Sequence, residues 1–569
     1  MPPPAATITI RATLSMLDGA RRDIAEAVAN DQYVFWLGSG ISRARMPDLR
    51  DLSKRIMLKL QSHIDQTAPN CRYRSALDAV VALAEPSHDE SANIDYSQSP
   101  DQWLVFDTLA ARLVNNYARM LDVSVDGEEA DFLLWYVLDA AKVYSDPAIE
   151  PDAEHLCLAA LAIEGVASEM PSANWDPLVE RAVSILSGLQ PILRTVIAPQ
   201  DTRSNRRRTN LYKFHGCAQA AHDDAAQFRR FLVARQSQIS GYIAHNAVMG
   251  NVLTNLIVTK RTLMLGLSAQ DSNIQGIFAA ANTQMPWRWP AQPPAYAFAE
   301  NALGGDQKSL LRNVYCLDDT PGTRPEMETA ALVQAYAKPL LLSLLLYVVT
   351  AKLKMLVGHG VPHLAAADLQ KLYGGLIHAR DYVADGLAPT AEAVLELLKL
   401  SGRAMTMLRQ GALPVVVANG HYTPISPDPV DRMLADPTLA GGGVCQFAVA
   451  SGLIGLGLER GLWTAGKPDV ADTTSGALIL FGRSGPAKIY FAANPEAAIR
   501  LRTNGLIAAN DDAVIVHSHE NPPSMPRFPR RPPGRSGLAA IREVSVDALL
   551  AVGTEVEDLL ERFRSKVAL

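Results

Sequence analysis

Four short polar segments in the first half of this 569-residue chain contain side chains that can bind or cleave a small ligand. The glycine turn at residues 38–42 (GSGIS) lets backbone N–H groups approach a phosphate. Asn174 and Asp176 place an amide and a carboxylate close together, and His215 can take a proton from a ribose hydroxyl or a water at neutral pH. Polar groups recur at residues 266–273. These residue types favour an anion or dinucleotide site with acid–base chemistry.

Three of the four segments also have a structural interpretation when each is taken alone. The glycine turn lacks the third glycine of a GxGxxG fingerprint, because Arg43 stands at that position, so it can be a tight turn and nothing more. Asp176 can cap the helix that begins after it. His215 can be a structural histidine. The residues leave these alternatives open segment by segment.

The elements that must position these groups are short apolar runs typical of buried strands. They lie at Tyr33–Leu37, 165–168, 211–214 and 262–267, each shortly before one of the polar segments. A buried strand, a glycine-rich turn and a helix form the first unit of a nucleotide-binding α/β sheet, and open sheets of this kind bind ligands at the carboxyl ends of their strands. The pattern predicts an α/β fold with a Rossmann-like parallel sheet.

Taken together, the four motifs and their order resemble the sirtuin family. The family's GAGIS and PDF motifs are similar to residues 38–42 and to Pro47-Asp48-Leu49. Its Asn-x-Asp motif resembles residues 174–176, its catalytic His-Gly resembles His215-Gly216, and its late ribose and adenine loop resembles residues 266–271. The resemblance covers roughly residues 15 to 290, about half of the chain.

The resemblance implies that NAD+ is the ligand. It implies that Asn174 orients a water or the ribose, that His215 is the general base and that Asp176 orders the nicotinamide end. The residues that it implies for NAD+ binding are Gly38, Ser39, Gly40, Ile41, Ser42, Asp48, Gly266, Ser268 and Asp271.

The cysteines decide which branch of the family the chain resembles. The five cysteines are scattered, with no CxxC spacing, so they provide no counterpart of the four-cysteine zinc module of the protein deacylases, and we expect no zinc. Asn-Trp-Asp followed by Pro-Leu-Val-Glu is closer to bacterial antiphage sirtuin-like NADases. The resemblance therefore implies an NAD+ glycohydrolase of abortive infection. An NAD-dependent protein deacylase and a non-catalytic nucleotide-binding regulator are the alternatives.

The chain is expected to divide into three parts. Residues 1–300 form the NAD-binding domain, with a helical insertion at about 85–150 that either packs as core or serves as a lid or oligomer surface. Residues 301–411 read as helices, with Pro339 as a break or first-turn residue. Residues 412–569 form a smaller α/β domain, a candidate sensor or partner-binding unit. Its expected strands lie at 414–418, 444–449, 477–481, 488–492 and 513–517, with a Pro- and Arg-rich loop at 521–537 and a closing helix at 544–567.

Composition sets the expected environment. With 53 Lys and Arg against 59 Asp and Glu, the net charge of −6 provides no global basic field, so contact with nucleic acid stays open only locally, for example at the arginines of 203–208. The scattered cysteines fit a reducing cytoplasm, and no signal peptide is recognisable. The apolar run 339–351 is short of the ~20 residues that span a bilayer, so we expect a buried helix. An enzyme that destroys NAD+ needs control, which predicts a homo-oligomer or a complex with a co-encoded sensor.

Overall fold

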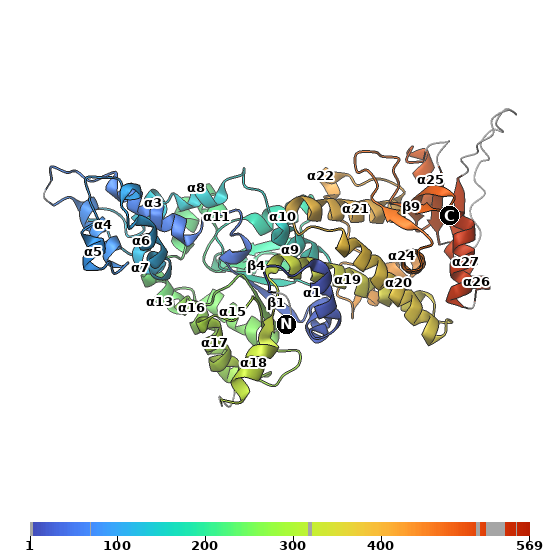
Figure 1. Cartoon of the computed structure of the whole chain (residues 1–569), viewed down its shortest axis with the longest axis horizontal. Helices are drawn as coiled ribbons and strands as arrows, with labels where there is room; N and C mark the ends of the chain where they lie inside the picture. Colours follow the sequence, from blue (N-terminus) through green and yellow to red (C-terminus); the bar gives the residue numbers. More distant parts are fainter. Residues whose placement is uncertain (1–3, 69, 317–320, 508–511, 519–540, 554) are drawn as a thin grey trace.

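The computed structural model describes residues 4–68, 70–316, 321–507, 512–518, 541–553 and 555–569. The molecule is elongated (Figure 1), with the helices between β1 and β2, labelled α3 to α7, at one end, a parallel sheet in the middle and the C-terminal α/β unit at the other end. The expected loop at 521–537 lies outside the described residues.

The central element is a seven-stranded parallel sheet with the strand order β3-β4-β2-β1-β5-β6-β7. This arrangement confirms the Rossmann-like fold that the sequence predicts. The chain continues from β1 to β2 on one side and later returns to β5 on the other, so the end of β1 is the topological switch point. The strands are β1 (Tyr33–Leu37), β2 (Glu169–Ser172), β3 (Leu193–Val196), β4 (Thr209–Lys213), β5 (Arg261–Leu265), β6 (Tyr296–Ala299) and β7 (Leu332–Val333).

Strand β1 is buried on both faces because its side chains alternate between two apolar cores. Tyr33, Phe35 and Leu37 belong to one core, shared with the helices α1 (Ile10–Asp18), α2 (Arg22–Ala29), α9 (Ala153–Ile163), α10 (Leu178–Ser187) and α19 (Ala337–Gly360). Val34 and Trp36 belong to the other, with α15 (Ala247–Thr259) and α16 (Ser272–Ala281). The continuous apolar run YVFWL is what this double burial requires.

Helices lie on both sides of β1 along the chain. Two of them, α1 and α2, precede it and are separated around Gly19. The insertion begins directly after the glycine turn, earlier than residue 85, and packs its own core against α10 and α11 (Ala218–Asp223). Its helices are α3 (Leu49–Gln61), α4 (Arg72–Ala82), α5 (His88–Ser91), α6 (Phe106–Leu113), α7 (Tyr117–Leu121), a π-helix at Leu133–Val137 and α8 (Ala140–Ser145).

The second half contains long helices and a second, five-stranded sheet, as predicted, with strand order β12-β11-β10-β9-β8. In this sheet β10, β11 and β12 are parallel, and β9 is antiparallel to β8 and β10. The helices are α17 (Gly305–Leu310), α18 (Thr323–Ala331), α19, α20 (Ala366–Asp385), α21 (Ala391–Gln410), α22 (Val416–Asn419), α23 (Pro437–Gly441), α24 (Val444–Glu459), α25 (Pro495–Thr503), α26 (Val546–Val552) and α27 (Val556–Val567). The strands are β8 (Thr464–Gly466), β9 (Leu478–Gly482), β10 (Gly485–Ala492), β11 (Ala513–His517) and β12 (Arg542–Ser545).

Several expected elements of the second half are wrong. The run 444–449 begins α24, a buried apolar helix, because a short apolar run alone does not separate a strand from a buried helix. The run 414–418 leads into the short helix α22, and the region 544–567 begins with the end of β12 before two helices follow. Strand β7 lies inside the region expected to be helical, beyond residue 300. The domain boundaries themselves stay a prediction.

Helix α19 joins the two halves of the molecule. Its side chains up to Val348 share the core of β1, whereas Leu356 and Val357 belong to the core of the second sheet. Pro339 lies in its first turn, where a missing N–H is tolerated. Among the described residues it is the one helix long and apolar enough to cross a membrane, and 67% of its apolar window is buried within the protein.

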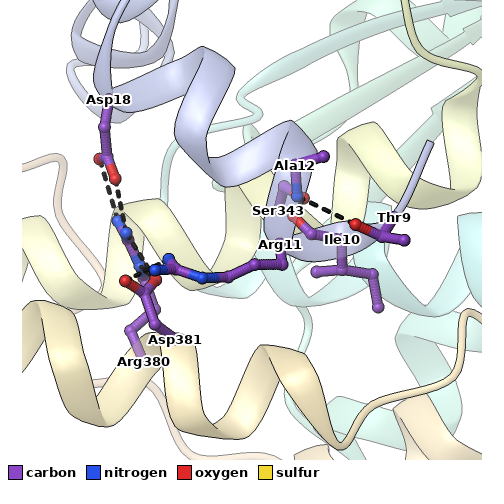
Figure 2. Close-up of polar contacts among 8 residues, drawn as sticks. All are labelled: Thr9, Ile10, Arg11, Ala12, Asp18, Ser343, Arg380 and Asp381. Carbon is purple, nitrogen blue, oxygen red and sulfur yellow. Dashed lines mark hydrogen bonds and ion pairs between the residues drawn. The ribbon is translucent and has the colours of Figure 1, made fainter. Parts of the chain in front are cut away.

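Polar contacts fix helix α1 to the second half (Figure 2). The hydroxyl of Ser343 on α19 donates to the carbonyl of Ile10 at 3.2 Å. Arg380 on α20 donates to the carboxylate of Asp18 at 3.0 Å, and Arg11 pairs with Asp381. The N-terminal helix is therefore bound to two helices of the second half.

The glycine turn packs backbone to backbone against the end of β5. The N–H of Gly38 donates to the carbonyl of Leu265, and the N–H of Gly40 donates to that of Gly266, both at 3.0 Å. Gly266 has a φ of +61°, in the left-handed region that favours glycine. A Cβ at Gly38 would lie 2.3 Å from the carbonyl oxygen of Gly266, so this approach excludes any side chain.

We expect the substitution Gly38→Ala to destabilise the α/β domain by about 2 kcal/mol or more, because the new methyl group meets rigid backbone. Gly305→Ala is the matched control, since a Cβ there meets nothing within 4 Å at the start of a helix. Thermal unfolding of the two variants beside the native protein measures the difference. Equal midpoints for both variants would contradict the close approach.

Candidate functional site

The four polar segments of the first half meet at one edge of the parallel sheet. Leu37 at the end of β1 pairs with Ser172 of β2 and with Leu265 of β5. Ser172 in turn pairs with Lys213 of β4. The glycine turn, Asn174, His215 and Gly266 therefore follow four strands that end in register, at the switch point where open α/β sheets bind ligands.

Asn174 is buried and its amide orientation is fixed by its partners. Its Nδ2 donates to the carbonyl of Gly38 at 3.0 Å and to the hydroxyl of Ser42 at 3.3 Å. Because a carbonyl oxygen only accepts, the NH2 group must face Gly38. The other amide atom, Oδ1, is buried and has no hydrogen-bond partner in the described part of the chain. A buried acceptor without a donor is costly, so this oxygen is suited to a hydroxyl or water of a ligand.

Ser42 has a second partner, His155, which the sequence analysis missed. The Nδ1 of His155 accepts the N–H of Asp152 at 3.1 Å, so the ring proton is on Nε2, which lies 3.1 Å from the Ser42 hydroxyl. Burial lowers the pKa of His155 to about 4, and the ring is therefore neutral. His155 donates to Ser42, whose oxygen accepts from both His155 and Asn174.

His215 is held in one tautomer by Asn273. The N–H of Ile274 donates to Asn273 Oδ1, so the Asn273 NH2 group faces the ring and donates to His215 Nε2 at 2.8 Å. Nε2 therefore carries the lone pair. Burial lowers the pKa of His215, although Asp271 opposes this effect, and the ring is a neutral base.

Asp271 and Asp176 lie at the site but have partners of their own. The carboxylate of Asp271 accepts the hydroxyl of Tyr117 at 2.7 Å, a contact from the helical insertion that the sequence did not indicate. Asp176 accepts the N–H of Leu178 at 3.2 Å, which is the helix-capping alternative, and its carbonyl accepts the Lys213 ammonium. Asp176 also acts on the site, because its charge opposes the lowering of the His155 pKa.

The remaining NAD-binding candidates are less closely grouped. Asp48 caps helix α3, with its carboxylate accepting the N–H groups of Arg50 and Asp51 at 2.9 Å. Ser268 is exposed after β5. Within the glycine turn, Ser39 and Gly40 are exposed whereas Ile41 and Ser42 are buried. The site thus has an open outer layer at the turn and a buried inner layer at Asn174.

A charged cluster lies beside the inner layer, at the start of α9. Asp152 pairs with Lys338 of α19 at 2.7 Å and lies 3.6 Å from the guanidinium of Arg45. Burial raises the pKa of the neighbouring Glu154 to about 7. Arg45 and the exposed Arg43 bring positive charge to the glycine turn.

Metal ligands and cavities are two further features of a candidate site. No three His, Cys, Asp or Glu side chains converge on a metal position among the described residues, and all five cysteines are buried and unpaired. Cavities of about 250 and 330 Å³ occur in and beside the insertion, where Tyr136 of the π-helix lines both.

Comparison with known families gives a match over part of the chain. Residues 169–318 match the model of the SIR2-like domain. The match begins at β2 and includes Asn174, Asp176, His215, Gly266 and Asp271, but not the glycine turn. No curated protein matches the sequence.

The neutral state of His155 predicts a pH dependence of stability. Its folded pKa of about 4 lies below the ordinary value, so stability is complete above about pH 6.5 and declines as the pH falls toward 4. His155→Gln keeps a donor toward Ser42 but does not titrate. When the pH falls from 7 to 5, we expect the free energy of unfolding to decrease in the native protein by about 2 kcal/mol more than in the variant. Urea unfolding followed by tryptophan fluorescence measures this, and identical pH dependence would rule out His155 as the titrating group.

Proposed function

We propose that the chain, whose residues 169–318 match the SIR2-like domain, is an NAD+ glycohydrolase. The proposed reaction breaks the bond between the nicotinamide nitrogen and C1′ of the ribose, and water supplies the hydroxyl that C1′ gains. The products are nicotinamide, ADP-ribose and a proton. The observation that carries the proposal is the buried, unpartnered Oδ1 of Asn174 beside the glycine turn.

The two layers of the site suit the two ends of such a substrate. The exposed outer layer, with Ser39, Gly40 and the nearby Arg43 and Arg45, has the open surface and positive charge that suit a pyrophosphate. The two arginines are the donors, because the N–H groups of both glycines of the turn are bonded to carbonyls at the end of β5. The buried inner layer offers acceptors, and the ammonium of the buried Lys213 is already held by the carbonyl of Asp176. We assign the nicotinamide ribose to this inner layer.

Asn174 orients the nucleophile in this proposal. Its NH2 group is occupied by Gly38 and Ser42, so its Oδ1 is left to accept a hydrogen bond from a water or a ribose hydroxyl. An acceptor held in place before the reaction stabilises the positive charge that develops at C1′ as the bond breaks. Asp176, which is buried nearby, is proposed to order the nicotinamide end.

His215 is proposed as the general base. Its Nε2 lone pair is directed at the Asn273 amide, and a water or ribose hydroxyl that replaces this amide would give its proton to Nε2. Burial keeps the ring neutral, which a base requires at neutral pH. The proton on Nδ1 stays in place throughout.

Water is proposed as the acceptor instead of an acyl-lysine. The five cysteines lie in separate elements, at the starts of α4, α11 and α24, within α9 and after the π-helix at Leu311–Tyr315. This distribution supports the resemblance to the hydrolase branch over the deacylase branch. The proposed setting is antiphage defence, with the second half acting as a sensor or as the surface for an oligomer or a co-encoded partner.

Purified protein is expected to convert NAD+ into nicotinamide and ADP-ribose, alone or in extract from infected cells. Asn174→Ala and His215→Ala should each lower the turnover by roughly 100-fold or more, because they remove the orienting acceptor and the base. Chromatography of the nucleotides measures turnover. Asn251→Ala and His88→Ala, at exposed positions on helices α15 and α5, are the matched controls.

Three outcomes distinguish the alternatives. Full turnover by both site variants would overturn the assignment of these residues. Release of nicotinamide only with an acetyl-lysine peptide would indicate a deacylase. Bound but intact NAD+ under every condition would indicate a regulatory module.

In bacteria that express the protein, we expect cellular NAD+ to fall after phage infection, and we expect no fall with the Asn174→Ala variant. The physical reason is that depletion requires the same bond cleavage as in the test tube. Measuring NAD+ and phage yield in both strains tests the proposed setting. Unchanged NAD+ in infected cells that contain an active enzyme would contradict antiphage defence and leave the hydrolase proposal standing.

A further inference from the structure

We propose that helix α19 of the second half positions Asn174 through helix α9, with Lys338 and His155 as positioning residues. This inference rests on the proposed function, because it assigns control of the same site. The structural link is a chain of polar contacts from Lys338 through Asp152, His155 and Ser42 to Asn174.

Helices α9 and α19 are joined by an ion pair at each end. Lys338 pairs with Asp152 at 2.7 Å, and Lys352 pairs with Glu164 at 2.6 Å. At ~1.5 Å of rise per residue, the two lysines are about 21 Å apart along α19 and the two carboxylates about 18 Å apart along α9. The spacings agree and the pairs follow in the same order, so the two helices run parallel, one beside the other.

The Lys352 end is a fully buried anchor. The ammonium donates to the carboxylate and carbonyl of Glu164 and to the carbonyl of Ser426, which uses its three hydrogens. The other carboxylate oxygen of Glu164 accepts from the Tyr422 hydroxyl and from the N–H of Ile425. Removal of one partner would leave an uncompensated buried charge, so this end is fixed.

The Lys338 end touches the site and is partly open to solvent. The side chain of Lys338 is 30% exposed, and it shares Asp152 with Arg45 while Glu154 lies 3.8 Å away. Asp152 caps α9 through the N–H of Ala153, and its own N–H donates to His155. The position of Asp152 therefore determines which nitrogen of His155 carries the proton.

The proton on His155 determines the orientation at Asn174. With Nε2 protonated, His155 and Asn174 both donate to the Ser42 oxygen, and the hydroxyl hydrogen is left to donate elsewhere. Without that donor, Ser42 can rotate and Asn174 loses one of the two acceptors that fix its amide. The Asn174 Oδ1 would then be held less firmly toward the reacting ribose.

The substitution Lys338→Met removes the charge but keeps the apolar stem. We expect it to lower kcat for NAD+ about tenfold with KM changed less than twofold, because orientation in the reaction is lost while the outer layer still binds NAD+. We expect Lys338→Arg to recover most of the loss. The matched control is Lys467→Met, which removes an exposed ion pair with Glu396 in the second half.

Two readouts separate positioning from a general loss of structure. Hydrogen exchange of a peptide covering residues 150–158 should accelerate in Lys338→Met and not in Lys467→Met, because the Asp152 N–H is one of the links. In a double-mutant cycle, Lys338→Met added to His155→Leu should cost little more kcat, because both act through the same contact.

The possible outcomes test the positioning link and the proposed NAD+ glycohydrolase activity separately. If the native protein cleaves NAD+ and Lys338→Met matches it in kcat and in exchange, this inference alone is overturned. Additive effects in the cycle, or equal losses in the Lys467→Met control, overturn it as well. The remaining outcome is that the native protein never cleaves NAD+ while Lys338→Met still accelerates exchange at residues 150–158. That result would overturn the proposed function, and with it the catalytic role assigned to the link.

Discussion

The contact between the glycine turn and Gly266 is the constraint on which the site depends. Two backbones meet there without room for a Cβ, and the N–H groups of Gly38 and Gly40 are committed to carbonyls at the end of β5. This contact closes the sheet at the switch point and places the carbonyl of Gly38 where it accepts from Asn174. Because strands β4, β2, β1 and β5 end in register, one contact positions residues that lie far apart in the sequence.

The second constraint is the shared helix α19. It contributes to the core under β1 and to the core of the second sheet, so the two halves do not pack as independent bodies. The same helix reaches the site through Lys338, and α1 binds it from another side through Ser343. A change that begins in the second half can therefore reach α9 without crossing a flexible linker.

The sequence was sufficient to predict the site where polar residues directly follow a strand. YVFWL followed by GSGIS predicts β1 and its turn, and the polar residues after β2, β4 and β5 lie at the same edge because parallel strands share their direction. Strand β2 was misplaced by four residues, since EMPS, with a glutamate and a proline, has a weaker strand signal than the preceding GVAS.

His155 was out of reach of sequence reasoning for a different reason. It stands in an apolar helix, AEHLCLAALAI, where a lone histidine is usually a core residue, and its partner Ser42 is brought to it only by the tertiary fold. The local signal that existed was Asp152 three residues before His155, since the structure pairs them in a reciprocal cap at the start of α9. The run at 444–449 failed because burial on all sides removes the periodicity that distinguishes helix from strand.

Charge is distributed unevenly between the outer and the inner layer of the site. Arg43 and Arg45 lie at the glycine turn, whereas the inner layer contains neutral histidines, an amide oxygen without a donor and the carboxylates of Asp176 and Asp271. A dinucleotide carries its negative charge at the pyrophosphate and develops positive charge at the ribose carbon when its glycosidic bond breaks. For the proposed reaction, cations outside and acceptors inside would suit both ends of that charge separation, and burial keeps the two histidines neutral before the reaction begins.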